Sequence, residues 1–108
     1  MMKKRIDRVN SLIRDLAGQF LLTQTQIKNT IITATRVETS PDLKSAKIFI
    51  TIFPEKEEDK ILGILNRKKR EWQRYLSSKF KAKFLPQSRF LIDEGEKSAR
   101  KVEELLAR

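Results

Sequence analysis

Two residue types that carry much of protein chemistry are missing from this chain of 108 residues, which contains neither cysteine nor histidine. Without cysteine the protein has no disulfide, no thiolate nucleophile and no thiol-ligated metal. Without histidine it lacks the commonest general base and metal ligand near neutral pH. These two absences argue against most nucleophilic and metal-dependent enzymes.

Long apolar stretches are missing as well. No run of apolar residues approaches the roughly 20 that are needed to cross a bilayer. The first residues are basic and lead into an amphipathic pattern, without the apolar block of a signal peptide. We therefore expect a cytoplasmic protein with no membrane partner.

Carboxylates are the remaining candidates for catalysis, since hard cations such as Mg²⁺ take oxygen ligands. Two acidic clusters qualify, and each is better explained as a helix start or a turn. The sequence therefore predicts no catalytic residue, no metal site and no cofactor, and a metal-dependent nuclease is the weakest alternative. The clusters are Glu55, Glu57, Glu58 and Asp59, and Asp93, Glu94 and Glu96.

Positive charge is what the chain has in excess. The formal net charge is +10, and segment 67–90 holds nine basic residues against one acidic residue. Charge of one sign concentrated in this way indicates an acidic partner, most often nucleic acid. A chain of this length is expected to form one domain, residues 1–108, which buries roughly two-thirds of its unfolded surface.

The stretch RVETSPDLKSAKIFITIF, residues 36–53, has the pattern of a β-hairpin. Pro41 and Asp42 favour a tight turn, because proline fixes φ and the aspartate side chain can bond its own backbone. Strict alternation follows the turn, and successive side chains of a strand point to opposite faces. One predicted face carries Ala46, Ile48, Ile50 and Ile52, and the other carries Lys47, Phe49, Thr51 and Phe53.

Hydrophobic periodicity places the other elements. It predicts helix at 4–22, strand at 29–39, helix from Glu55 to Phe80, strand at 89–92, a turn at 93–95 and a last helix with Ala99, Val102, Leu105 and Leu106. Residues 66–71 contain no apolar side chain, so a continuous helix and a kinked pair fit equally well. The order predicts an α+β two-layer domain, with helices on one face of a three-stranded sheet. The expected core includes Ile13, Leu16, Phe20, Ile48, Ile50, Leu65 and Leu76.

With these residues in place, the chain resembles the ribosome-binding factor A family, bacterial and organellar assembly factors with a KH-like fold. The resemblance is carried by Arg8-Val9, by Val37-x-x-Ser40-x-Asp42-Leu43-x-x-Ala46-Lys47-Ile48-x-Ile50-Thr51, and by Lys81-x-Lys83-x-Leu85-Pro86 with Phe90. It runs from the first helix to the end of the third strand. The family bends its middle helix at a small-residue Ala-x-Gly motif. Counted back from Pro86, the position of this motif corresponds to Lys68-Lys69-Arg70 in this sequence.

The resemblance implies a type II KH-like domain that binds the free small ribosomal subunit and its rRNA. It further implies assistance in late maturation of 16S rRNA, without catalysis, and we expect the protein to act as a monomer. The alternative is a basic nucleic-acid-binding protein with a permanent structural role, of the ribosomal or DNA-packing type. On the open side of the sheet, Lys47 and Thr51 are expected to be exposed. Phe49 and Phe53 are expected to be partly exposed, and either stack on RNA or pack beneath a loop or the N-terminal segment.

KH-like domains hold single-stranded nucleic acid by clamping its backbone in a basic groove. Trp72 and Tyr75 lie among the cations of segment 67–90, but their spacing with Leu76 favours the core over base stacking. The predicted RNA-binding residues are Arg67, Lys68, Lys69, Arg70, Arg74, Lys79, Lys81 and Lys83 in the groove, Lys4, Arg5 and Arg8 in an N-terminal arm, and Lys47 on the sheet.

Overall fold

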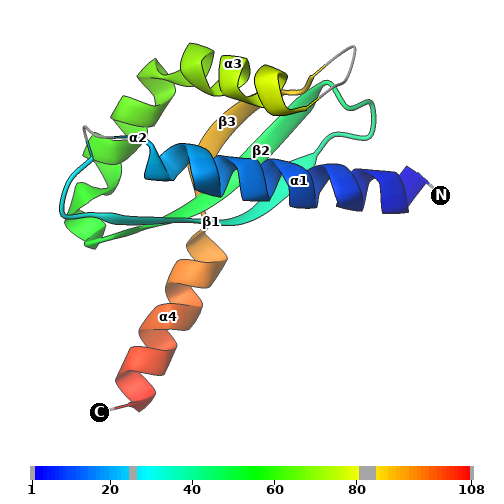
Figure 1. The fold of residues 1–108 in the computed structure, drawn as a ribbon. Helices are drawn as coiled ribbons and strands as arrows, with labels where there is room; N and C mark the ends of the chain where they lie inside the picture. The colour runs from blue at the N-terminus through cyan, green and yellow to red at the C-terminus, as the bar shows by residue number, and fades with distance from the viewer. Residues whose placement is uncertain (1, 25–26, 81–84, 108) are drawn as a thin grey trace.

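The structure, a computed structural model, describes residues 2–24, 27–80 and 85–107, with side chains from residue 5 onward. The order of elements confirms the predicted α+β class (Figure 1). The elements are α1 (Met2–Leu22), β1 (Ile31–Thr39), β2 (Ser45–Phe53), the 3₁₀ turn η1 (Glu55–Glu57), α2 (Glu58–Arg67), α3 (Lys69–Lys79), β3 (Gln87–Ile92) and α4 (Glu94–Leu106).

The strands that the structure describes form one mixed sheet in the order β1-β2-β3. β1 and β2 are antiparallel, and β2 and β3 are parallel. The predicted turn joins the antiparallel pair: the Ser40 amide donates to the Ser45 carbonyl at 2.9 Å, and the Lys44 amide donates to Asp42 Oδ1 at 3.0 Å. The turn thus fixes the register in which Thr39 lies opposite Ala46.

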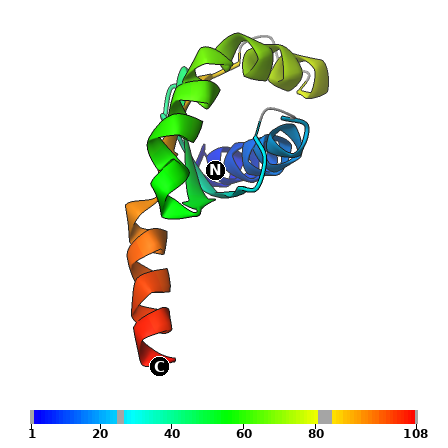
Figure 2. The same ribbon diagram turned by 90° about the vertical axis from the view of Figure 1, so that its left-hand side faces the viewer.

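The aliphatic face of β2 is the floor of the core, as the alternation predicted. Ala46, Ile48, Ile50 and Ile52 are each at most 5% exposed. Helices α1, α2 and α3 cover this face (Figures 1 and 2). Burial of all seven predicted core residues confirms the predicted register: these are Ile13, Leu16, Phe20, Ile48, Ile50, Leu65 and Leu76.

Trp72 is the centre of an aromatic cluster within this core. Its side chain is fully buried, and its ring centroid lies 5.5 Å from that of Phe20 and 5.9 Å from that of Phe90. Tyr75 packs alongside and is half-buried, with its hydroxyl 3.1 Å from Gln19 Oε1 on α1. The prediction that Trp72 and Tyr75 serve packing is confirmed for the tryptophan, and the tyrosine joins α3 to α1.

The middle helix is broken at Lys68, so the kinked pair is the correct alternative. Lys68 has φ −100° and ψ 17° and separates α2 from α3. Its amide still reaches the Ile64 and Leu65 carbonyls, and its own carbonyl accepts from the Trp72 amide at 3.0 Å. The chain therefore bends here while its backbone groups stay paired, although neither glycine nor alanine stands at the bend.

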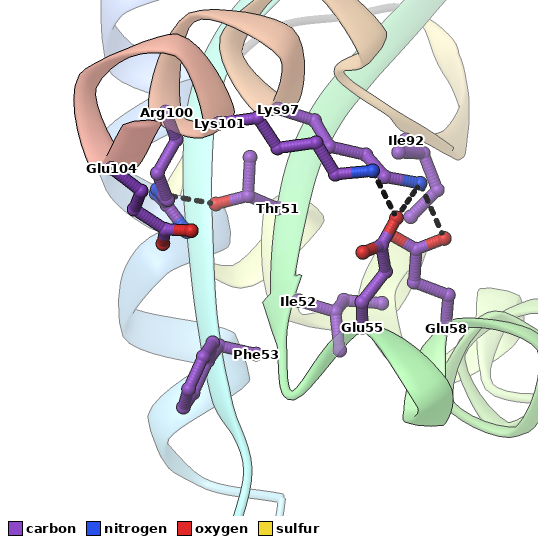
Figure 3. Close-up of a pocket in the computed structure, with 10 residues that line it drawn as sticks. All are labelled: Thr51, Ile52, Phe53, Glu55, Glu58, Ile92, Lys97, Arg100, Lys101 and Glu104. Atoms are coloured by element: carbon purple, nitrogen blue, oxygen red, sulfur yellow. Dashed lines mark hydrogen bonds and ion pairs between the residues drawn. The ribbon is translucent and has the colours of Figure 1, made fainter. Parts of the chain in front are cut away.

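The last helix does not lie on the sheet with the other helices but extends away from it (Figure 2). Its sheet-proximal side is charged. Lys97 Nζ lies 2.6 Å from Glu55 Oε1 and 3.1 Å from Glu58 Oε1, and Lys101 Nζ lies 3.5 Å from Glu55 Oε1 (Figure 3). The hydrogen bonds that Lys97 donates to Glu55 and to Glu58 raise the pKa of this lysine above its usual range. The apolar residues Val102, Leu105 and Leu106 are 54–81% exposed.

Two expectations near α4 are wrong. Thr51, expected on the exposed face, is only 4% exposed because Arg100 of α4 lies over it, with Nη2 at 3.4 Å from Thr51 Oγ1. The predicted turn at 93–95 is instead the start of a helix. Asp93 is its N-cap, and Glu94 and Gly95 belong to the first turn of α4.

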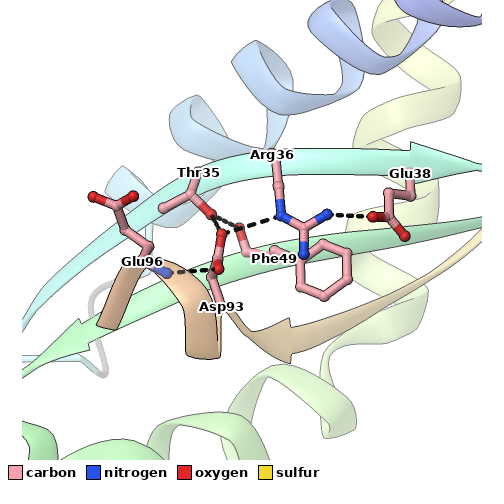
Figure 4. Close-up of polar contacts among 6 residues, drawn as sticks. All are labelled: Thr35, Arg36, Glu38, Phe49, Asp93 and Glu96. Atoms are coloured by element: carbon pink, nitrogen blue, oxygen red, sulfur yellow. Dashed lines mark hydrogen bonds and ion pairs between the residues drawn. The ribbon is translucent and has the colours of Figure 1, made fainter. Parts of the chain in front are cut away.

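Asp93 fixes the point where β3 ends and α4 begins (Figure 4). Its Oδ1 accepts from the Glu96 amide at 3.0 Å, while Oδ2 lies 2.6 Å from Thr35 Oγ1 and 3.3 Å from Arg36 Nε. Thr35 is the extra residue of a β-bulge in β1, where the register shifts between Ala34 and Arg36. One carboxylate therefore caps α4 and holds the bulge.

We expect Asp93→Ala to lower the free energy of unfolding by about 1–3 kcal/mol at neutral pH, because it removes an N-cap and the acceptor of two further partly buried hydrogen bonds. Burial opposes ionisation of Asp93, but the hydrogen bonds from Thr35 and Glu96 and the charge of Arg36 outweigh it and lower its pKa. Its stabilising effect is thus present above the ordinary aspartate pKa and is lost as the pH falls through the lowered value. Urea unfolding between pH 7 and pH 2 measures this: the difference between wild type and variant should shrink at the acid end, and a constant difference would contradict the assignment.

Candidate nucleic-acid interface

A basic cleft lies where the hairpin end of the sheet meets the break in the middle helix. Its volume is about 360 Å³, and it presents three exposed cations from three elements: Lys47 on β2, Lys69 on α3 and Arg89 on β3. Ser45, Ala46, Gln87 and Ser88 complete the lining.

The sheet register brings the two strand cations together. In the parallel β2–β3 pair, Lys47 is the partner of Arg89, so both side chains leave the sheet on the same face. On the other side of Lys47, Glu38 of β1 pairs with Arg36. The carboxylate directly across the strands from Lys47 is thus engaged by another cation.

A pair of hydrogen bonds positions the third cation. Gln73 of α3 donates through Nε2 to the Pro86 carbonyl at 3.3 Å, and the Ser88 amide donates to Gln73 Oε1 at 3.1 Å. Residues four apart lie on one face of a helix. Lys69 therefore stands one turn before Gln73, on the side of α3 that faces β3.

The structure gathers only part of the predicted set in this cleft. Arg67, Arg70, Arg74 and Lys79 are exposed on α2 and α3 outside its lining, and Arg5 and Arg8 are exposed on α1. Lys68 differs from its neighbours: its side chain is 19% exposed and lies 3.5 Å from Glu71. Lys81, Lys83 and the side chain of Lys4 lie outside the described residues.

Arg89 is the cleft residue that sequence reasoning missed. It was placed in the third strand, but its role depends on the parallel pairing with β2, which local pattern does not reveal. The available signal in the sequence was its place next to the apolar Phe90, because neighbouring side chains of a strand point to opposite faces. The burial of Phe90 and the exposure of Arg89 agree with this alternation.

The two phenylalanines of the open face have different surroundings. Arg36 Cζ lies 3.8 Å from the centroid of the Phe49 ring, so a cation–π contact covers one side of this half-buried ring. Phe53 is 57% exposed. Base stacking thus stays a prediction, and Phe53 has the more accessible ring.

Two other features bear on function. Among the residues that the structure describes, no three Asp, Glu, His or Cys side chains are grouped so that they could hold a metal ion. None of the helices in the described ranges combines the length and apolar character needed to cross a membrane.

The order of elements, the mixed three-stranded sheet and the broken middle helix define an α+β domain of the KH-like class. The family model for ribosome-binding factor A matches residues 5–106. The chain belongs to the ribosome-binding factor A family.

Curated relatives of the same description agree with this assignment. The ribosome-binding factor A of Opitutus terrae is 34% identical over 101 residues, which cover 92% of this chain and 83% of the relative. That of Bdellovibrio bacteriovorus is 30% identical over 106 residues, covering 95% of this chain and 78% of the relative.

Solved structures confirm the fold. The crystal structure of ribosome-binding factor A from Thermus thermophilus has a TM-score of 0.69 at 19% identity, covering 81% of this chain and 94% of its own. The solution structure of a Thermotoga maritima protein described as a putative ribosome binding factor A has a TM-score of 0.68 at 24% identity, with 81% and 85% coverage. A third set of coordinates, a homology model of the Thermus factor fitted into a cryo-EM map of its complex with the 30S subunit, has a TM-score of 0.62 at 20% identity. It covers 76% of this chain and 88% of its own.

Proposed function

We propose that this protein binds the free small ribosomal subunit, contacts its rRNA through the basic cleft, and assists late maturation of 16S rRNA. It acts as a cytoplasmic monomer, without a catalytic step and without a cofactor. The observation that carries the proposal is the family match over residues 5–106, since the family is that of a ribosome-binding factor. The fitting of the Thermus factor into a 30S complex supports the same partner.

The cleft suits RNA backbone because its cations come from rigid elements. Strand pairing holds the backbone of Lys47 and Arg89, and the hydrogen bonds of Gln73 hold α3, which carries Lys69, against β3. Phosphate contacts of this kind set register and orientation and carry no base sequence directly. The protein would therefore recognise the shape and charge of an rRNA segment and stabilise one arrangement of it during maturation.

The flanking cations extend this surface beyond the cleft. Arg70 and Arg74 follow Lys69 on α3, and both are exposed. In the proposed complex they contact phosphates next to the segment held in the cleft. Lys68 has the smaller part, since its side chain is largely covered and paired with Glu71.

The salt dependence of binding tests this mode of recognition. If about 4–6 cations engage phosphates, the logarithm of the affinity for purified small subunits should fall linearly with the logarithm of salt concentration, with a slope of about −3 to −5. Fluorescently labelled protein titrated at several potassium concentrations measures the slope. A slope near zero, or strong preference for one short RNA sequence, would contradict the proposal.

A further inference from the structure

A second basic surface lies at the opposite end of the sheet from the cleft and is formed by residues outside the predicted RNA-binding set. A hollow of about 470 Å³ is formed where the loop before β1 meets the start of α2. Lys28, Lys56 and Lys60 line it from the loop, η1 and α2, together with Asn29, Thr30, Pro54 and Glu57. We call this the lysine hollow.

The cations of the lysine hollow are largely without internal partners. Within the described part of the chain, Lys28 and Lys56 form no ion pair, and both are exposed. Lys60 lies 4.0 Å from Glu57 and is 73% exposed, which makes a weak contact. Like charges that converge without a counter-ion repel one another, so this arrangement favours an anionic ligand.

One carboxylate, Glu57, lines the hollow beside its three lysines and lies 4.0 Å from Lys60, so positive charge stays in excess there. Two further carboxylates of this segment, Glu55 and Glu58, are engaged elsewhere. Glu55 and Glu58 lie on the side of η1 and α2 that faces α4, where Lys97 binds both and Lys101 binds Glu55 (Figure 3). The same short segment thus divides into an acidic side held by α4 and a basic side that opens onto the lysine hollow.

The loop that carries Lys28 has a defined shape. The Thr30 hydroxyl donates to the Lys28 carbonyl at 3.0 Å, and Asn29 adopts φ 56°, a left-handed conformation that asparagine tolerates better than most residues. The hollow and the cleft lie at opposite ends of β2, near Phe53 and Ala46. At the usual rise per residue of a strand they are roughly 25 Å apart.

We propose that the lysine hollow binds the phosphodiester backbone of rRNA at a point separate from the cleft, so that the protein holds the small subunit at both ends of its sheet. This inference rests on the proposed function and extends it from one contact surface to two. Two separated contacts would fix the orientation of the protein on the subunit, which a single cleft does not.

Neutralising two lysines tests the inference. Lys28→Gln combined with Lys56→Gln should lower the affinity for purified small subunits about tenfold at low ionic strength, and should reduce the magnitude of the salt slope by about 1.5, as expected for two lost phosphate contacts. Lys28→Arg with Lys56→Arg keeps the charge and should bind like wild type. Circular dichroism melts of both variants confirm that they fold.

A control variant with the same net charge distinguishes a specific contact at the lysine hollow from general electrostatic attraction between a basic protein and RNA. Arg14→Gln with Lys101→Gln removes the same charge from exposed residues outside both surfaces, and Glu55 keeps its contact with Lys97. An equal loss in this control, or unchanged affinity and slope in the Lys28 and Lys56 variant, would overturn the second contact and leave the cleft in place. Failure of the wild type to bind small subunits would overturn the proposed function, and this inference with it.

Discussion

Lys69→Glu combined with Arg89→Glu is expected to lower the affinity for small ribosomal subunits by about 100-fold or more and to leave thermal stability nearly unchanged. Each reversal replaces an attraction of about 1 kcal/mol to a phosphate with a repulsion of similar size, and about 1.4 kcal/mol corresponds to tenfold in affinity. Both side chains are exposed, and exposed substitutions usually change the free energy of unfolding by less than about 0.5 kcal/mol.

Subunit pelleting at several protein concentrations measures this affinity, and the double variant Lys69→Arg with Arg89→Lys is the charge-retaining control. Lys68 is a poor substitute as a target, because its side chain is largely covered and contacts Glu71. If the charge-reversed protein binds as well as wild type, the RNA surface lies elsewhere. Arg67, Arg70 and Arg74 would then be the next candidates.

The largest loss of stability is expected from Trp72→Ala, at about 3–5 kcal/mol. The indole is fully buried and contacts the rings of Phe20, Tyr75 and Phe90, so its removal opens a cavity at the junction of α1, α3 and β3. For a domain of this size, each kilocalorie lowers the melting temperature by roughly 4–8 °C.

Trp72→Phe is the matched control, since it keeps a ring in the same place and should cost much less than the alanine variant. Guanidinium unfolding followed by far-ultraviolet circular dichroism gives both values, because the tryptophan itself is lost as a fluorescent probe. A cost below about 1 kcal/mol for Trp72→Ala would mean that the aromatic cluster is not a cooperative part of the core.

The register of the sheet and its contribution to the core could be predicted from the sequence, because the strict alternation in β2 decides which residues face the helices. Ile48 and Ile50 alternate with residues of the open face, and a shift of one residue would have turned the whole aliphatic set towards solvent. The burial of Thr51 could not be predicted in this way. It depends on Arg100, about fifty residues later in the chain, and on a helix attached by charged contacts.

The direction of α4 could not be predicted from the sequence either, because it also depends on contacts with residues distant in the chain. Its apolar residues Val102 and Leu105 predicted a helix but left its docking open, and the charged residues Lys97 and Lys101 make the attachment. An amphipathic pattern shows that a helix has two faces. It does not show which of them meets the rest of the molecule when acidic partners such as Glu55 are available.

The sequence predicted a basic surface for nucleic acid, but it identified only some of the residues that line the cleft. The concentration of charge in segment 67–90 singled out a set that includes Lys69, which lines the cleft, and strand alternation placed Lys47 on the exposed face. Arg89 joins them through parallel pairing, and the lysine hollow arises where Lys28 meets Lys56. The topology of the fold decides which distant residues lie side by side. The distribution of charge along the sequence does not predict this.

Sedimentation of a tagged copy through a sucrose gradient of cell extract tests the central claim most directly. The proposed function predicts that the protein co-migrates with free small subunits, is enriched on those that carry immature 16S rRNA, and is absent from translating ribosomes. A permanent ribosomal component would instead be found in stoichiometric amounts on translating ribosomes. That result, or migration with DNA or as free protein only, would contradict the assignment as an assembly factor.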